Sequence, residues 1–208
     1  MASTNTNTAQ SKQLPDTRPA EKNTAAKAAS KRLVSLESFL KRYTNREDPY
    51  KYEWNSGVVE KKPRTMNRDQ LKILQCLMRL FSRTKAYAAM GELMSEVDML
   101  MQTVNRTRRA DIAYMSDEQI QAAPNGELSI CSFVAEVISK NDQINEVEEK
   151  LQEYFDNGVQ VVWVIFPKLK QVKVYHSVRD ITVRFGDDLC SAAPVLPDFE
   201  ITVNEIFA

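Results

Sequence analysis

The sequence contains a single histidine, His176, and three widely separated cysteines, Cys76, Cys131 and Cys190. The absence of a CxxC pair or a histidine cluster excludes the common zinc-binding frameworks. Unpaired cysteines also indicate thiols that stay reduced, as is typical of a cytoplasmic protein. No apolar run approaches the roughly 20 residues needed to cross a bilayer, and the N-terminus lacks the apolar core of a secretion signal. We therefore expect a cytoplasmic protein without a membrane partner.

Net charge is also absent, because 28 basic residues balance 28 acidic ones over 208 residues. Bulk charge gives no support for a nucleic-acid partner, which would need local basic patches or bound cations. Residues 1–32 hold six basic residues and two acidic ones, with almost no large aliphatic side chains. They are predicted to form a disordered basic tail. Residues 33–208 are predicted to form one globular domain, in line with the chain's 43% hydrophobic content.

Helix and strand patterns follow one another in mixed order through residues 33–208. Ser35 can cap a short helix, and strand-like runs around Asn55-Ser56-Gly57 predict a β-hairpin over residues 50–62. Apolar spacing predicts helices over 67–86 and 142–158, the second ended by Gly158. Strands are predicted over 92–102, 108–115, 128–139, 159–167 and 170–177, with short strands and a final helical turn from 180 onward. This order predicts an α/β fold, a central mixed β-sheet flanked by helices.

Two carboxylates fall inside predicted strands. Glu136 lies in SFVAEVIS, where strand alternation puts it on one face with Ser132, Val134 and Ile138. Burying an unpaired carboxylate costs on the order of several kcal/mol, so Glu136 must be paired, protonated or bound to a metal. Asp111 lies inside the predicted strand RRADIAYM, so the same requirement for a partner applies to its carboxylate. Carboxylates on neighbouring strands could converge on a divalent cation, and hard oxygen ligands favour Mg²⁺ or Mn²⁺.

Lys150 lies on or beside the apolar stripe of the second predicted helix. This stripe, which we expect to face the sheet, consists of Ile144, Val147, Leu151 and Tyr154 or Phe155. The Lys150 ammonium can snorkel to solvent, or it can reach an acidic site and stabilise the charge of a phosphate there.

Each of these residues also has a simpler interpretation. Lys150 could pair on the surface with Glu146, Glu136 could pair with a core arginine, and Asp111 could end its strand at a turn. One metal site would account for all three residues together.

Two basic clusters could contact a DNA backbone. The first, at residues 106–109, includes Arg108 and Arg109 and leads into Asp111. The second, at residues 61–64, includes Lys62 and follows the hairpin. Ordinary solvation of loops is the alternative interpretation of both clusters.

The ordered combination of these motifs resembles one known family. Asp111 is followed by Glu136-Val137-Ile138-Ser139, then by Lys150-x-x-x-Tyr154-x-x-x-Gly158-Val159 and VVWVIFP. The hairpin YKYEWNSGVVEKKP, with Glu53, and the closing segment LPDFEITVNEIF are also similar. From about residue 33 to the C-terminus, the chain resembles the Uma-two-type putative restriction endonucleases, a branch of the PD-(D/E)XK phosphodiesterases.

The resemblance implies a restriction-endonuclease-like core and Mg²⁺-dependent hydrolysis of DNA phosphodiester bonds, with Mn²⁺ as a substitute. It implies that Asp111 and Glu136 ligate the metal, with the Val137 carbonyl as a third ligand. Lys150 and Glu53 complete the implied catalytic set.

Several residues depart from the family pattern. Ile138 occupies the superfamily's usual lysine slot, so the resemblance implies that Lys150 takes the lysine role from the following helix. Asn67 stands where many members carry histidine, and we group it with the expected DNA contacts. Ala110, Lys140 and Phe166 also replace residues that are usual in the family.

These departures motivate an alternative function, a catalytically degenerate nuclease fold that acts as a DNA-binding or regulatory module. A third option is an interaction protein that does not bind DNA. For an endonuclease, cleavage of two strands would benefit from two sites, so a homodimer is also an expectation.

Overall fold

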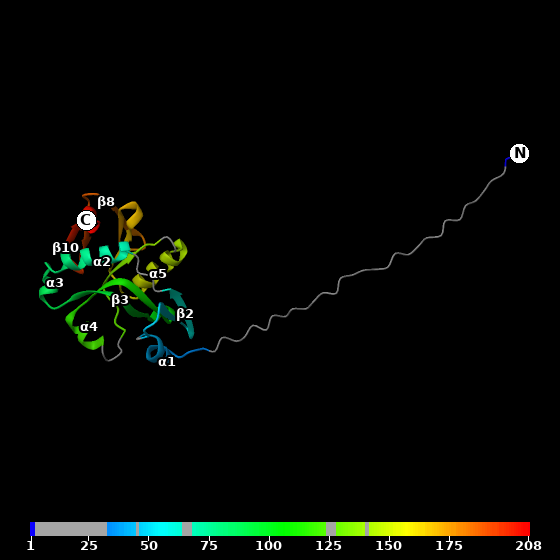
Figure 1. Ribbon diagram of the computed structural model, residues 1–208, viewed down its shortest axis with the longest axis horizontal. Helices are drawn as coiled ribbons and strands as arrows, with labels where there is room; N and C mark the ends of the chain where they lie inside the picture. The colour runs from blue at the N-terminus through cyan, green and yellow to red at the C-terminus, as the bar shows by residue number, and fades with distance from the viewer. Residues whose placement is uncertain (3–32, 45, 64–67, 124–127, 140–141) are drawn as a thin grey trace. The chain divides into compact units, whose positions relative to one another are not determined.

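The computed structural model describes residues 1–2, 33–44, 46–63, 68–123, 128–139 and 142–208 (Figure 1). The predicted tail lies almost wholly outside these ranges, and so does Asn67. All helices and strands belong to the unit formed by residues 32–208.

Ten strands are present in the described residues. They are β1 (Tyr50–Asn55), β2 (Val58–Pro63), β3 (Glu92–Met101), β4 (Arg106–Met115), β5 (Phe133–Val137), β6 (Val161–Phe166), β7 (Gln171–Ser177), β8 (Asp180–Phe185), β9 (Leu189–Ala192) and β10 (Leu196–Thr202). The predicted hairpin is confirmed as β1 and β2, joined at Ser56 and Gly57. Both turn residues have positive φ, which is the backbone geometry of the tightest hairpin turns.

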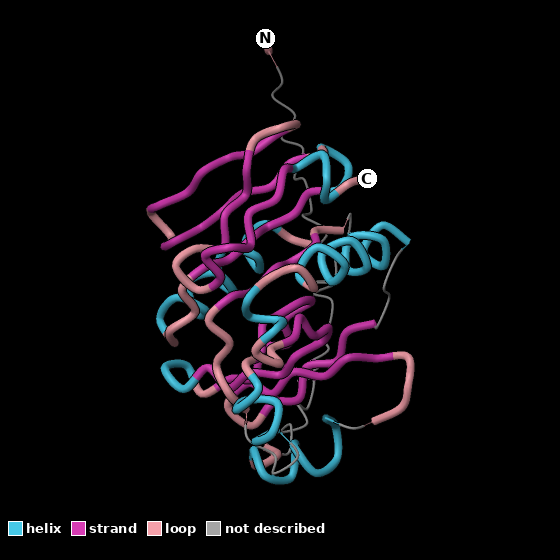
Figure 2. The backbone as a smooth tube through the Cα atoms, turned by 90° about the vertical axis from the view of Figure 1, so that its left-hand side faces the viewer, coloured by secondary structure: helices cyan, strands magenta, loops and turns pink. Residues whose placement is uncertain are grey.

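The helices lie against the strands (Figure 2). They are α1 (Leu36–Phe39), α2 (Arg68–Phe81), α3 (Lys85–Ala88), α4 (Asp117–Ala122), α5 (Ile144–Asp156) and α6 (Val203–Ile206), with the single turns η1 (Leu40–Thr44), η2 (Gln102–Val104) and η4 (Pro167–Leu169). Ser35 caps α1 as predicted. None of the helices in the described ranges has the length and apolarity needed to cross a membrane.

One eight-stranded sheet organises the domain. Its order is β2-β1-β4-β5-β6-β7-β8, with β3 paired to β4 outside this path, and β9 and β10 form a separate pair. Only β5 and β6 run parallel; the other neighbours are antiparallel. The crossover between β5 and β6 contains α5, as a parallel connection requires. The predicted mixed sheet with flanking helices is therefore confirmed.

The two faces of this sheet carry different cores. Phe133, Ala135 and Val137 of β5 pack with α2, β9, β10 and α6. Val134, on the opposite face, packs with Leu151 and Tyr154 of α5. Strand alternation places Glu136 on the α5 face with Val134, as predicted from the sequence. A charged side chain is thereby directed beneath a helix.

Some sequence predictions differ from the structure. The strand predicted over 128–139 is limited to β5, and the Cys131 N–H before it contacts the Met99 sulfur. Ile144 was predicted to face the sheet, but it is exposed because it is the first residue of α5. The sequence patterns extended the first long helix to residue 86 without separating α2 from α3, and they did not predict α4. The capping box of Ser116 and Gln119 is a local signal that could have identified α4.

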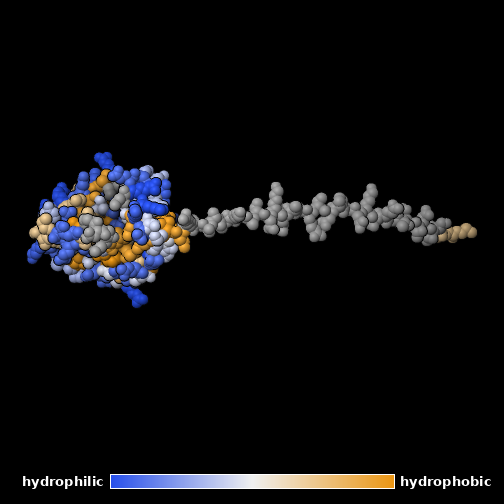
Figure 3. All heavy atoms as spheres, turned by 90° about the horizontal axis from the view of Figure 1, so that it is seen from below, coloured by the Kyte–Doolittle hydropathy of each residue, from blue (hydrophilic) through white to orange (hydrophobic). Residues whose placement is uncertain are grey.

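Hydrophobic side chains also reach the surface of the domain. On the face drawn in Figure 3, orange hydrophobic and blue hydrophilic residues are interspersed. Scattered exposed hydrophobic residues are normal in soluble proteins. A single exposed hydrophobic residue therefore does not indicate a binding surface, whereas several that lie side by side can.

Candidate functional site

A cavity of about 490 Å³ lies where the hairpin, β4, β5, α2 and α5 meet. Its lining includes all four residues predicted to be catalytic, Glu53, Asp111, Glu136 and Lys150. The sequence separates these residues by almost 100 positions, and the sheet brings them to one place. Their roles in a reaction remain predictions.

Asp111 and Glu136 occupy neighbouring strands. The β4–β5 register pairs Ile112 with Ala135, so one step further places Asp111 across from Glu136. The Oδ2 atom of Asp111 accepts a hydrogen bond from the Val137 N–H at 3.0 Å. Asp111 does not end its strand, because β4 continues to Met115. The interpretation of Asp111 as a turn residue is therefore wrong.

Glu136 is buried and has a donor on each carboxylate oxygen. Lys150 Nζ donates to Oε2 at 2.8 Å, and the Tyr154 hydroxyl donates to Oε1 at 2.7 Å. Burial raises the pKa of Glu136, and nearby Asp111 adds to this, while Lys150 opposes it. Glu136 and Lys150 thus pair with each other. The alternatives, in which Glu136 pairs with an arginine and Lys150 pairs with Glu146, are therefore wrong.

The Lys150 ammonium is held among acceptors. Besides Glu136, it donates to the Arg109 carbonyl at 3.0 Å. Burial tends to lower the Lys150 pKa, but the charges of Glu136, Asp111 and Glu53 outweigh burial and raise it. Lys150 therefore stays protonated at neutral pH and presents a positive charge at the cavity.

Glu53 comes from β1, on the other side of β4. Its carboxylate accepts from the Arg109 N–H at 3.2 Å and from Arg108 Nη1 at 3.5 Å. Burial favours the protonated form, but Lys150, Arg108 and Lys62 together lower the pKa of Glu53. Glu53 is thus a buried carboxylate that remains ionised.

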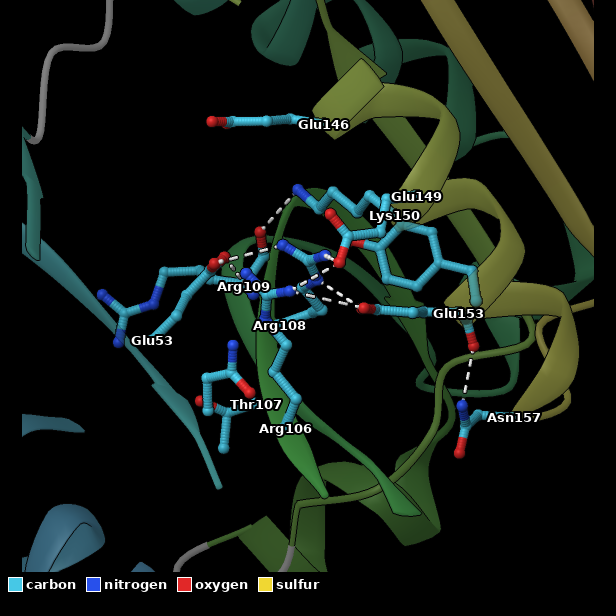
Figure 4. Close-up of polar contacts among 12 residues, drawn as sticks. Glu53, Arg106, Thr107, Arg108, Arg109, Glu146, Glu149, Lys150, Glu153 and Asn157 are labelled. Atoms are coloured by element: carbon cyan, nitrogen blue, oxygen red, sulfur yellow. Dashed lines mark hydrogen bonds and ion pairs between the residues drawn. The ribbon is translucent and has the colours of Figure 1, made fainter. Parts of the chain in front are cut away.

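Arg106 and Arg108 of β4 form a buried ion-pair network with α5 (Figure 4). Glu153 accepts from Arg108 Nε and lies 3.4 Å from Arg106 Nη1. Arg106 also pairs with Glu149 of α5 at 3.0 Å and with Glu60 of β2 at 2.8 Å. The network ties the hairpin, β4 and α5 together behind the cavity, and so it positions the residues that line it.

The expected DNA contacts are found in different environments. Arg108 and Arg109 are only 2% and 3% exposed. Arg109 makes two hydrogen bonds to Asp98, at 2.7 and 2.6 Å. The interpretation of residues 106–109 as a solvated loop is wrong. Contact between Arg108 or Arg109 and DNA would require breaking buried ion pairs, so the structure does not support them as direct DNA contacts.

Lys62 lies at the cavity and is partly exposed. Its Nζ is 3.1 Å from Glu146 Oε2, which links β2 to α5. Asn67, the remaining expected DNA contact, lies outside the described residues.

Several lining residues, among them Tyr154, Lys51, Gln70 and Glu96, were given no functional role from the sequence. Tyr154 had a local signal, since it follows Lys150 by one helical turn. Lys51 lies 3.8 Å from Asp111 Oδ1, and Gln70 of α2 donates to the Val137 carbonyl at 3.1 Å. Glu96 has a positive φ and lies between Ser95 and Val97 of β3, whose register partners Ile112 and Ala110 flank Asp111. Lys51, Gln70 and Glu96 approach through tertiary structure, which no local pattern reveals.

The donor atoms at the cavity are suited to a hard divalent cation. Six carboxylates and four basic groups line it: Glu53, Glu96, Asp111, Glu136, Asp142 and Glu146, with Lys51, Lys62, Arg108 and Lys150. Oxygen donors and a net negative lining fit Mg²⁺ or Mn²⁺. In the described ranges, no three His, Cys, Asp or Glu side chains converge on one metal position. Asp111 and Glu136 would therefore need backbone or solvent oxygens to complete the coordination.

Comparison with known proteins identifies the family. The Uma2 family, described as "putative restriction endonuclease", matches residues 36–204. The chain belongs to this family. No curated protein matches the chain.

One solved structure shows the same fold for the Uma2 chain. A crystal structure of a "putative nuclease belonging to DUF820" from Anabaena variabilis ATCC 29413 superimposes with a TM-score of 0.67. The two sequences are 18% identical, and the match covers 84% of this chain and 97% of the other. A cryoEM structure of a DrdV–DNA complex matches 56% of this chain and 12% of its own, at 11% identity. Its TM-score of 0.31 is too low to support an argument.

Proposed function

We propose that this Uma2 protein is a divalent-metal-dependent endonuclease that hydrolyses phosphodiester bonds in DNA. The observation that carries the proposal is the meeting of Asp111, Glu136 and Lys150 in one cavity, from two adjacent strands and α5. Membership of a family of "putative restriction endonucleases" supports nuclease chemistry. Because cysteines that form no disulfide suit a reducing compartment, we place this activity in the cytoplasm.

Asp111 and Glu136 would hold Mg²⁺ or Mn²⁺, with the Val137 carbonyl as a further oxygen ligand. A bound ion supplies a Lewis acid and lowers the pKa of water, so that hydroxide is accessible near neutral pH. The hydrogen bond from the Val137 N–H fixes the Asp111 carboxylate. Gln70 donates to the Val137 carbonyl and orients it.

Lys150 would stabilise the negative charge that develops on the scissile phosphate. Its ammonium is fixed by Glu136 and the Arg109 carbonyl, so little reorganisation is needed when that charge forms. Glu53 contributes to the field that keeps Lys150 protonated. We assign contacts with the DNA backbone to Lys51 and Lys62, which line the cavity and are more exposed than the arginines of β4.

Cleavage of supercoiled plasmid tests the proposal directly. We expect nicked and linear products when Mg²⁺ or Mn²⁺ is present and intact plasmid when EDTA replaces the metal. Agarose gel electrophoresis separates the three forms. The proposed nuclease activity would be contradicted if plasmid, single-stranded DNA and duplex DNA all remained uncut at every metal concentration.

A degenerate DNA-binding module is the second candidate. It is favoured by Ile138, which packs beside the α5 core where the superfamily's lysine is usual. This module would retard DNA on native gels in EDTA and would leave it uncut after Mg²⁺ is restored. The absence of both cleavage and salt-dependent DNA binding would exclude both candidates.

Tyr154 is expected to set the metal requirement. Its buried hydroxyl orients Glu136, so Tyr154→Phe should raise the Mg²⁺ concentration for half-maximal cleavage by about 10–100-fold. The rate at saturating Mg²⁺ should change little, since phenylalanine keeps the packing. Plasmid cleavage measured against Mg²⁺ concentration tests this.

The matched control is Tyr175→Phe. Tyr175 is a buried tyrosine of the same core cluster and does not line the cavity. The Mg²⁺ requirement of this variant should equal that of the parent. Equal requirements for all three proteins would rule out a positioning role for the Tyr154 hydroxyl.

A further inference from the structure

Strand β8 ends the eight-stranded sheet. It pairs with β7 on one side, and no strand of the described residues pairs with its other side. An unpaired edge presents backbone N–H and C=O groups that can accept a further strand. Proteins usually protect such an edge with charge, proline or a covering element.

On one face of β8 the side chains are apolar and do not protect its edge in this way. Ile181, Val183 and Phe185 are 43%, 44% and 49% exposed. They occupy alternate positions of the strand and so share one face. Three large apolar side chains in a row differ from scattered exposed residues and are typical of a contact surface.

Two charged residues on the opposite face of β8 have no ion-pair partner in the described chain. Asp180 and Arg184 flank Thr182 and form none of the salt bridges present. The Arg184 Nε atom is buried and makes no hydrogen bond with any residue described. Four residues in a strand span about 13 Å, so Asp180 and Arg184 of one copy cannot pair with each other.

The order of these residues is complementary to itself. If two copies of β8 run antiparallel about a two-fold axis at Thr182, each Asp180 lies opposite the Arg184 of the other copy. The same register places Ile181 opposite Val183. Opposite charges and apolar residues that face each other directly stabilise antiparallel strands. A two-fold axis produces each of these pairs twice.

We propose that β8 is a homodimer interface, in which two copies pair antiparallel about Thr182 and join their sheets into one. The self-complementary order of charges identifies the partner as a second copy of this chain. The residues of this edge do not line the cavity, so the inference stands independently of the proposed nuclease activity.

The oligomeric state of the full-length protein tests the interface. Light scattering after size exclusion, over a range of concentrations, should give a dimer for the parent. Val183→Glu should weaken dimerisation by at least about 100-fold, because it buries a charge against Ile181 of the second copy. The matched control is Val104→Glu in η2, an exposed valine outside β8, which should remain dimeric.

A charge exchange tests the register itself. Asp180→Arg places like charges opposite each other twice and should also weaken dimerisation by at least about 100-fold. Adding Arg184→Asp to this variant should restore the dimer, since the pairs are then reversed. Circular dichroism confirms that each variant is folded.

Three outcomes would overturn the proposal. A parent protein that is monomeric at every concentration has no such interface. A folded Val183→Glu variant that dimerises like the parent places the interface elsewhere. A folded double variant that stays monomeric excludes pairing between Asp180 and Arg184.

Discussion

Asp111→Asn is expected to reduce plasmid cleavage by at least about 100-fold while the protein remains folded. Asparagine has nearly the same shape and can still accept the hydrogen bond from the Val137 N–H. It lacks the negative charge with which Asp111 would hold the proposed divalent cation. The loss should therefore persist at high Mg²⁺ concentration, which initial rates of plasmid cleavage would show.

The stability of this variant should not fall. The Asp111 charge raises the pKa of Glu136, which means that the two carboxylates repel each other in the folded protein. Removing one charge relieves that repulsion but also removes the attraction of Asp111 to Lys51 and Lys150, so the thermal midpoint should stay close to the parent's. Lost cleavage with retained stability is the expected signature of a residue kept for function.

Glu146→Gln is the matched control, because it makes the same chemical change in the same cavity. Glu146 is exposed at the first turn of α5 and pairs with Lys62. Cleavage by this variant should stay within a few-fold of the parent. If Asp111→Asn cleaves plasmid as fast as Glu146→Gln, the proposed role of Asp111 is wrong.

Glu153→Gln is expected to lower the free energy of unfolding by about 3–5 kcal/mol. Glu153 is a buried residue of α5 and is shared by Arg106 and Arg108. Burial alone would lower the pKa of Arg108, but the charges of Glu153 and Glu53 outweigh this effect and raise the pKa. Glutamine removes the charge and leaves two buried guanidinium groups poorly compensated. Urea unfolding followed by circular dichroism measures the change.

Glu149→Gln is the control on the same helix and with the same partner. The Glu149 side chain is 57% exposed and also pairs with Arg106, whereas the Glu153 side chain is 7% exposed. Solvent screens an exposed pair, so this variant should cost less than about 1 kcal/mol. Similar losses for both variants would show that burial does not determine the strength of the network.

Local patterns were sufficient for much of the fold. The hairpin at Ser56 and Gly57, the strand alternation around Glu136 and the helical spacing around Lys150 each depend on neighbours within a few residues. Local sterics and periodicity dictate such features. The same patterns also indicated that Glu136 and Lys150 need partners, because a charge among apolar residues is costly to bury unless it is paired.

The β4 arginines show where local patterns fail. Arg106, Arg108 and Arg109 form a basic cluster in the sequence, which indicates a solvated or DNA-binding loop. Their carboxylate partners lie on β1, β2, β3 and α5, up to 55 residues away in the chain for the Arg108–Glu53 pair. Only the folded sheet brings these charges together, and this pairing allows the arginines to be buried.

The sequence by itself determined that this chain forms a mixed α/β domain with two carboxylates in strands and a lysine on a helix. The tertiary structure alone decided that Glu136 receives donors from Lys150 and Tyr154, and that Gln70 contacts the Val137 carbonyl. Strand and helix patterns are set by contacts between near neighbours. The partner of a buried charge is set by the register of strands and the docking of helices, which depend on the whole chain.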